Sequence, residues 1–174
     1  MSVSDGVAAM VRAHRDTEPV AALHTRGPLT LEDAYGIQRR VFDTLWGADG
    51  VAGYKISLVA PEHRASFGAS EPTFGRLAAH QVLTGSPEVP LDSMLSPLVE
   101  PELVFTVDRD LAPAASPDKV LASCHVSAGL EIPESRFRGW FPVPDQTVGD
   151  LVADNSFAGL VVHSEHSVPA SDVD

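Results

Sequence analysis

The sequence contains a single cysteine, Cys124, which excludes an internal disulfide. It has no run of five basic residues, and 12 lysines and arginines stand against 24 acidic residues. Because phosphate binding needs clustered basic side chains, this balance argues against a nucleic-acid partner. No apolar run reaches the ~20 residues that a membrane helix requires, so no membrane partner is expected. The first residues show no basic region followed by an apolar stretch, so we expect no signal peptide and a cytoplasmic location.

Aromatic residues are also few: they make up 6% of the chain, whereas hydrophobic residues together make up 44%. This hydrophobic content argues against disorder and predicts a core built mainly from aliphatic side chains and alanine. With 174 residues, the chain is long enough for one ordinary domain, which we expect to span residues 1–174.

Helical and strand patterns are mixed along the chain without the regular alternation of a doubly wound fold, which predicts the α+β class. We expect helices capped by Ser4 and Thr30, and a third after Ser116 that carries Cys124. The segment EPTFGRL is expected to be a loop, because proline and glycine punctuate it. The expected strands cover residues 51–59, 98–107, 127–137 and 156–162; a loop and short helix are expected over residues 142–155.

The apolar segment LSPLVEPELVFTV contains two glutamates, Glu100 and Glu102, with Pro101 between them. Alternate side chains of a strand point to opposite faces, so both carboxylates share one face, while Val99, Leu103 and Phe105 are expected to pack on the other. Since proline cannot donate a ladder hydrogen bond, the pattern predicts an edge strand or a bulge. Two carboxylates on one face can chelate a hard divalent cation. The alternative is a strand with one solvated face.

A third acid, Glu131, lies in the segment GLEIPESRF, at the start of an apolar strand where a charge is out of place. It could complete a set of three oxygen ligands. It could also be an ion-pair partner for Arg136, or belong to a solvated strand end. Three acids in two predicted strands do not by themselves establish a metal site.

From about Ala8 to its end, the sequence resembles the 2-keto-4-pentenoate hydratase group of the fumarylacetoacetate hydrolase superfamily, which includes the 4-oxalocrotonate decarboxylases. The resemblance rests on six segments in the family's order: LTLEDAYGIQ, GYKISL, EPTFGRL, VEPELVF, LEIPESRF and LVADNSFAGLVV. It implies N-terminal helices followed by a mixed β-roll that is incomplete at the C-terminus.

The resemblance implies that Glu100, Glu102 and Glu131 are ligands of Mg²⁺ or Mn²⁺. In this family the metal binds the carboxylate and the 2-oxo or enol oxygen of a small 2-oxo acid, and stabilises an enolate as a Lewis acid. Lys55 corresponds to the family's active-site lysine, and is implied to act as a proton donor or an electrostatic stabiliser. Without the resemblance, a lysine at a strand end in water is the preferred interpretation.

The same resemblance implies that Asp154 is a second catalytic residue. The residues implied to bind substrate are Ser57, Leu58, Thr73, Arg136 and Asn155. From the residues alone, an Asp-Asn pair is more typical of a turn or a cap. Arg136 could instead be structural and hold a carboxylate.

Three positions depart from the family pattern. Ser57 stands where the family has a glycine that allows close approach of the backbone. Thr73 stands where hydratases commonly have an acid, which removes a candidate general acid or base. His163 replaces another glycine and forms an H-x-x-H pattern with His166, but a polar chain end is not a typical zinc site.

The resemblance implies a divalent-metal-dependent hydratase that acts on a small 2-hydroxy-dienoate or 2-oxo acid through a metal-stabilised enolate. A 2-oxo acid decarboxylase of the same family is the first alternative, and a non-catalytic subunit that stabilises an active partner is the second. Members of the family continue well past Asp174, so we expect a single, C-terminally shortened domain. A homo-oligomer, or a partner chain that supplies the missing part, would then protect the open sheet edge.

Overall fold

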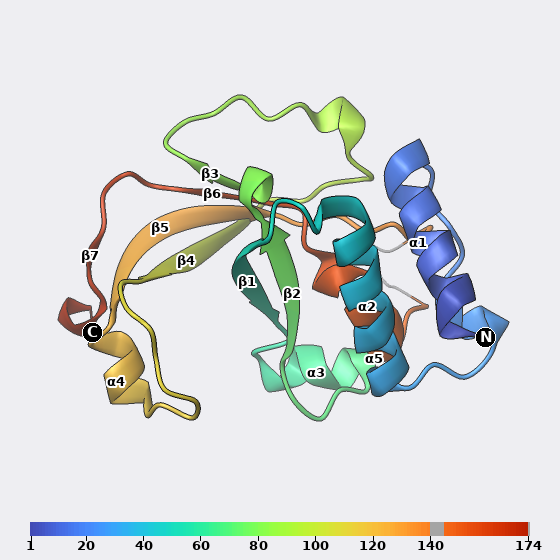
Figure 1. Cartoon of the computed structure of the whole chain (residues 1–174), viewed down its shortest axis with the longest axis horizontal. Coiled ribbons are helices and arrows are strands. Elements are labelled where there is room, and N and C mark those ends of the chain that lie inside the picture. The colour runs from blue at the N-terminus through green and yellow to red at the C-terminus, as the bar shows by residue number, and fades with distance from the viewer. Residues whose placement is uncertain (140–144, 174) are drawn as a thin grey trace.

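In the computed structural model, which describes residues 1–139 and 145–173, the two long helices lie at one end of the molecule, whereas the larger sheet and one short helix extend to the other (Figure 1). The helices are α1 (Val3–Asp16), α2 (Leu31–Trp46), α3 (Pro61–Phe67), α4 (Pro117–Leu121) and α5 (Val148–Ala153). The strands are β1 (Val51–Ser57), β2 (Thr73–Ala78), β3 (Val82–Thr84), β4 (Glu100–Val107), β5 (Cys124–Ile132), β6 (Leu160–His163) and β7 (Val168–Pro169). Helices followed by a mixed sheet confirm the predicted α+β class.

Side-chain caps define the starts of the two long helices. Thr30 caps α2 as predicted, and its hydroxyl oxygen accepts a hydrogen bond from the Asp33 backbone N–H at 3.1 Å. The cap of α1 is Ser2 rather than Ser4, because Ser2 forms a reciprocal capping box with Asp5. The helix therefore begins about one half-turn earlier than the apolar pattern predicted.

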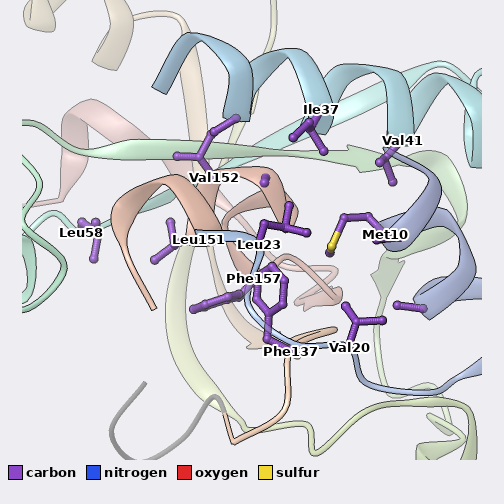
Figure 2. Close-up of a cluster of buried hydrophobic side chains, with 14 residues drawn as sticks. Met10, Val20, Leu23, Ile37, Val41, Leu58, Phe137, Leu151, Val152 and Phe157 are labelled. Carbon is purple, nitrogen blue, oxygen red and sulfur yellow. The ribbon is translucent and has the colours of Figure 1, made fainter. Parts of the chain in front are cut away.

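The principal hydrophobic core lies where α1, α2 and α5 meet, and it is largely aliphatic, as the composition predicts (Figure 2). Met10 of α1, Ile37 of α2 and Val152 of α5 are each fully buried in it. Burial of one such side chain contributes about 1.5–3 kcal/mol, so this contact area fixes how the helices are arranged. Phe157, from the turn after α5, joins the same core and brings the following chain towards the sheet.

Two sheets carry the candidate site. Strands β1 and β2 form an antiparallel ribbon. The larger sheet has the order β3-β6-β5-β4, with β7 added beside β5. Strand β3 is parallel to β6, and the other pairs of this sheet are antiparallel. The sheet is therefore mixed, as expected from the family resemblance.

The prediction of a loop over EPTFGRL is wrong, because Thr73–Ala78 forms strand β2. Gly75 lies within this strand, opposite Lys55. A Cβ atom at Gly75 would lie 2.1 Å from the backbone oxygen of Asn155. The glycine therefore permits a close approach between two backbones and does not mark a turn.

Strand β4 lies at the edge of the larger sheet within the described part of the chain, which confirms the inference from Pro101. Its second face does not pack against the core as predicted. Val99, Leu103 and Phe105 are 64%, 60% and 48% exposed, respectively. The alternation of the sequence gives the correct faces of the strand, but it could not indicate whether anything covers them.

Several helix and strand boundaries differ from those predicted. Cys124 begins strand β5 and does not belong to the helix after Ser116, and the strand after α5 begins at Leu160, not at Ser156. Strand β1 ends at Ser57, two residues early, because Leu58 has a φ of 60° and turns its side chain into the core. Residues 142–144 of the predicted loop lie outside the described residues. None of the described helices is long and apolar enough to span a membrane.

Candidate metal centre

Three glutamates converge at the start of the β4–β5 hairpin. Glu100 pairs directly with Glu131 across the two strands, and Glu102 lies two residues further along the same face. One carboxylate oxygen from each residue lies within 4.8 Å of the others. Among the described residues this is the one group of three or more acidic, histidine or cysteine side chains close enough to share an ion.

Gly129 leaves space on the face of the sheet that carries the glutamates. It pairs with Glu102 on one side and with His163 on the other. A Cβ atom at Gly129 would lie 2.6 Å from Val104 Cγ2 and 3.2 Å from the Val162 carbonyl oxygen. A side chain at this position would therefore crowd Val104 and the β6 backbone on the face of the sheet that carries the glutamates.

The environments of the three carboxylates differ. Glu100 and Glu102 are exposed, whereas Glu131 is 4% exposed. Burial raises the pKa of Glu131 above its ordinary value of 4.5, and the charges of Glu100 and Glu102 raise that pKa further, whereas Lys55 lowers it. The interpretation of Glu131 as part of a solvated strand end is therefore wrong.

Lys55 reaches the cluster from the neighbouring ribbon. Its Nζ atom lies 2.9 Å from Glu131 Oε1, and its side chain is only 9% exposed. The interpretation of Lys55 as a strand-end lysine in water is wrong, and so is the pairing of Glu131 with Arg136. The contact also joins β1 to β5, so one ion pair connects the two sheets.

The residues present fit a divalent cation. In formal charges, three carboxylates and one ammonium sum to −2 at the cluster. Glu131 Oε1 is buried and, apart from the ion pair with Lys55, has no well-directed hydrogen bond within the described structure. Oxygen donors alone are the ligands that Mg²⁺, Mn²⁺ and Ca²⁺ prefer.

The H-x-x-H pattern does not add a ligand. The ring nitrogens of His163 contact Thr84 Oγ1 and the Ser164 carbonyl oxygen, each at 3.1 Å. His166 is exposed. These neighbours hold the His163 ring at the end of β6, between β3 and β5.

Asp154 and Arg136 form a second, fully buried charge pair. Arg136 Nε donates to Asp154 Oδ1, and the Arg136 Nη2 atom donates to the Asp154 carbonyl oxygen at 2.9 Å. Ser135 Oγ and the Arg136 backbone N–H also donate to Asp154 Oδ2, at 2.7 and 2.8 Å. Burial raises the pKa of Asp154 to about 6, and Arg136 opposes this effect, so we expect the carboxylate to be ionised at neutral pH. The geometry is that of a structural anchor, in agreement with the structural alternative for Arg136.

The chain after Asp154 makes an unusual left-handed turn. Asn155, Ser156 and Phe157 all have positive φ values, of 54°, 54° and 60°. For residues with a Cβ atom this conformation costs about 1–2 kcal/mol each, so surrounding contacts must hold it. Sequence patterns do not indicate a left-handed turn over three consecutive residues. Ser156 is therefore not among the site residues predicted from the sequence.

Hydroxyl groups hold this turn against the ribbon. Ser57 Oγ donates to the Ser156 carbonyl oxygen at 3.3 Å, and Ser156 Oγ donates to Thr73 Oγ1 at 3.2 Å. Ser57 and Thr73 are direct partners in the β1–β2 ladder. The structure therefore brings Ser57, Thr73 and Asn155 together around the ribbon, as the family motifs imply. It places the Leu58 side chain in the hydrophobic core instead (Figure 2).

The chain thus combines an α+β fold with a carboxylate cluster suited to a divalent cation, and known proteins resemble it in sequence and in fold. No family model matches the chain. A 2-keto-4-pentenoate hydratase of Burkholderia vietnamiensis is 30% identical over 185 residues, covering 100% of this chain and 68% of the relative. A 2-hydroxypent-2,4-dienoate hydratase of Pseudomonas putida is 30% identical over 162 residues, covering 90% of this chain and 71% of the relative. The chain therefore belongs to the family of 2-keto-4-pentenoate hydratases and 4-oxalocrotonate decarboxylases.

A solved structure shares the fold. The 4-oxalocrotonate decarboxylase of Pseudomonas putida G7, complexed with magnesium and adipate, superposes with a TM-score of 0.87 at 21% identity. The match covers 99% of this chain and 65% of that one. A 2-keto-4-pentenoate hydratase of Paraburkholderia phymatum, 33% identical, is matched over 58% of its length and 90% of this chain. The chain thus spans about three fifths to two thirds of the length of such relatives.

We expect Asp154→Asn to destabilise the fold strongly. The substitution keeps the shape of the side chain but removes the nearer of the two carboxylates that pair with Arg136 and leaves only Glu134, at 3.3 Å; breaking a buried pair of this kind costs about 3–5 kcal/mol. The free energy of unfolding, measured with urea, checks this. Asp108→Asn is the control, because Asp108 pairs with His125 at the surface, where the loss should stay within about 1 kcal/mol. Equal losses in the two variants would contradict the anchoring role of Asp154.

Proposed function

We propose that this chain is a divalent-metal-dependent lyase, or the part of one, that hydrates a small 2-hydroxy-dienoate or 2-oxo acid. The observation that carries the proposal is the cluster of Glu100, Glu102 and Glu131 with Lys55 against its buried member. A carboxylate cluster that only faced water would not need a buried lysine beside it. The names of the relatives support the same reaction class.

In this proposal Glu100, Glu102 and Glu131 hold Mg²⁺ or Mn²⁺. When bound, the ion would supply a Lewis acid at the carboxylate and 2-oxo oxygens of the substrate. The solved relative contains magnesium together with adipate, itself a carboxylic acid, which supports this assignment. Lys55 would hold a positive charge, or a proton, beside the reacting oxygen.

The remaining predicted site residues divide into two groups. We propose that Ser57 and Thr73 contribute to substrate binding from the face of the ribbon that carries Lys55, while their hydroxyls bond the Ser156 turn. For Asp154, Asn155 and Arg136 we propose positioning roles, because their side chains bond buried protein groups. The Leu58 side chain contributes to the core.

A specific observation favours the decarboxylase alternative. Thr73 is 4% exposed, and its hydroxyl oxygen already accepts a hydrogen bond from Ser156. A threonine held in this way cannot replace the acid that hydratases commonly have there. Turnover of a 2-hydroxy-dienoate should be compared with release of CO₂ from an unsaturated 2-oxo diacid. The faster reaction identifies the activity.

We also propose that a further polypeptide covers the exposed face of the larger sheet, as either a second copy or a partner chain. Leu103 and Phe105 of β4, Leu130 of β5 and Val168 of β7 share this face. They are between 44% and 60% exposed. A contiguous apolar patch of this kind is typical of an interface. If the chain is itself inactive, covering a catalytic partner is the alternative function.

Residues 1–174 are proposed to form one domain, because core residues come from segments as distant as α1 and the turn after α5. A cytoplasmic location stays a prediction.

We expect Mn²⁺ to raise the melting temperature relative to EDTA, because the ion binds the folded state preferentially. At 100 times its Kd the gain is about 2.7 kcal/mol. Glu102→Gln removes one ligand charge and should reduce this gain. Glu88→Gln, at an exposed acid outside the cluster, should keep the full response. A response that is equal in both variants would show that the cluster does not hold the ion.

We expect Lys55→Met to lower turnover about 100-fold or more while the chain still binds Mn²⁺, because lysine is not a ligand of this ion and its charge acts on the substrate. Methionine keeps most of the buried volume. Lys119→Met, on the exposed helix α4, is the control and should retain activity. Steady-state rates with any partner chain present check this, and unchanged turnover of the Lys55 variant would rule out a catalytic role.

We expect Leu103→Glu to weaken association with the second copy or partner chain, because it places a charge in the apolar face. Leu91→Glu is matched in exposure, at 58% against 60%, but it lies outside that face. Sedimentation velocity at micromolar concentration measures the effect. A wild type that sediments as a monomer with no partner, or equal association of both variants, would contradict the proposed interface.

A further inference from the structure

Asn155 makes a pair of contacts that resembles the pairing of one strand with another. The Arg76 backbone N–H donates to Asn155 Oδ1 at 2.8 Å, and Asn155 Nδ2 donates to the Arg76 carbonyl oxygen at 2.7 Å. The side chain is thus bound at both ends to the same residue of β2. Asn155 is 5% exposed, so water cannot easily replace these bonds.

These bonds are next to the strand position opposite the lysine. Gly75, which adjoins Arg76, is the ladder partner of Lys55. The backbone oxygen of Asn155 approaches Gly75 so closely that a Cβ atom there would lie 2.1 Å away. The left-handed turn therefore touches β2 both at the partner of Lys55 and at the next residue.

Outside its own ladder the ribbon is held by the Gln38 amide, which donates to the Phe74 carbonyl oxygen at 2.9 Å, and by the turn after Asp154. In the described structure β1 pairs only with β2, and its outer face leaves Tyr54 and Ile56 59% and 58% exposed. A two-stranded ribbon is marginally stable by itself and needs a docking contact. The contact with the turn after Asp154 supplies one at the level of Lys55.

We propose that Asn155 is a positioning residue for Lys55, which acts through β2 to hold the ammonium group against Glu131. The two hydrogen bonds of the Asn155 amide fix the position of β2 relative to the turn. The β1–β2 ladder then fixes the position of Lys55 relative to β2. Without the amide, the ribbon would move relative to β5, and the 2.9 Å contact of Lys55 with Glu131 would open. This placement does not depend on the reaction, whereas its effect on turnover rests on the proposed function.

The chain offers a direct measurement, because its only lysines are Lys55 and Lys119. Lys55 is buried and ion-paired, whereas Lys119 is exposed on α4. Acetylation with an N-hydroxysuccinimide ester, followed by peptide mass spectrometry, gives the rate at each lysine. The ratio of the two rates reports on the Lys55 contact and corrects for reagent and pH.

The test variants are Asn155→Ala, which removes both bonds, and Asn155→Asp, which keeps the acceptor and loses the donor. The matched control is Gln81→Ala. Gln81 is also a buried amide, and it also bonds two backbone groups, the Ala78 N–H and the Gly159 carbonyl oxygen, both at 2.9 Å. It lies beyond the other end of the ribbon, since Ala78 pairs with Val51.

We expect the labelling ratio of Lys55 to Lys119 to rise about fivefold to tenfold in Asn155→Ala, as for loss of one or two buried hydrogen bonds. It should rise less in Asn155→Asp and stay near the wild-type value in Gln81→Ala, even if all three melt earlier. An unchanged ratio in both Asn155 variants, or an equal rise in Gln81→Ala, overturns the proposal. If Asn155→Ala does not fold, the ratio in Asn155→Asp decides.

A second readout separates this proposal from the proposed function. Titration with Mn²⁺ should give the wild-type affinity in Asn155→Asp, because Asn155 does not contact the glutamates. With an active enzyme, kcat should fall and KM should change little. If the wild type turns over none of the substrates but the labelling ratio rises as expected, the function is wrong and the positioning role stands. Loss of Mn²⁺ affinity would instead overturn the positioning role.

Discussion

The buried ion pair between Lys55 and Glu131 is the interaction on which the site depends. Both side chains are almost completely withdrawn from water, at 9% and 5% exposure, so each would be costly to bury without the other. The pair joins the β1–β2 ribbon to the β4–β5 hairpin, two units that share no backbone ladder in the described structure. Because the pair compensates only one of three carboxylates, the cluster keeps an excess of negative charge that suits a divalent cation.

The turn after Asp154 provides the mechanical support for that pair. Asp154 and Arg136 neutralise each other in the interior and fix where the turn begins. The following left-handed residues then bring the Asn155 amide and the Ser156 hydroxyl to β2. Strained backbone conformations of this kind persist only where surrounding contacts determine them, and they occur frequently at functional sites. Here the strain lies against β2, the ladder partner of the strand that carries Lys55.

The most reliable sequence signals were local. Thr30 and the apolar spacing after it gave helix α2, because capping and periodicity depend only on nearby residues. The alternation around Glu100 and Glu102 gave their shared face, and Pro101 gave the edge position of β4. Strand β2 was missed because its glycine looks like a loop signal. In the structure that glycine allows contact with Asn155, which is eighty residues away in the sequence.

The sequence by itself determined the α+β class, the two principal helices and the chemical identity of the cluster, since residue type and period are written in it. Only the tertiary structure decided which acids meet, because Glu131 is placed opposite Glu100 by long-range strand pairing. It also decided that Lys55 is buried against Glu131 and that Asp154 is buried against Arg136. Burial and charge compensation depend on neighbours far apart in the chain, and no local pattern of residues encodes those distances.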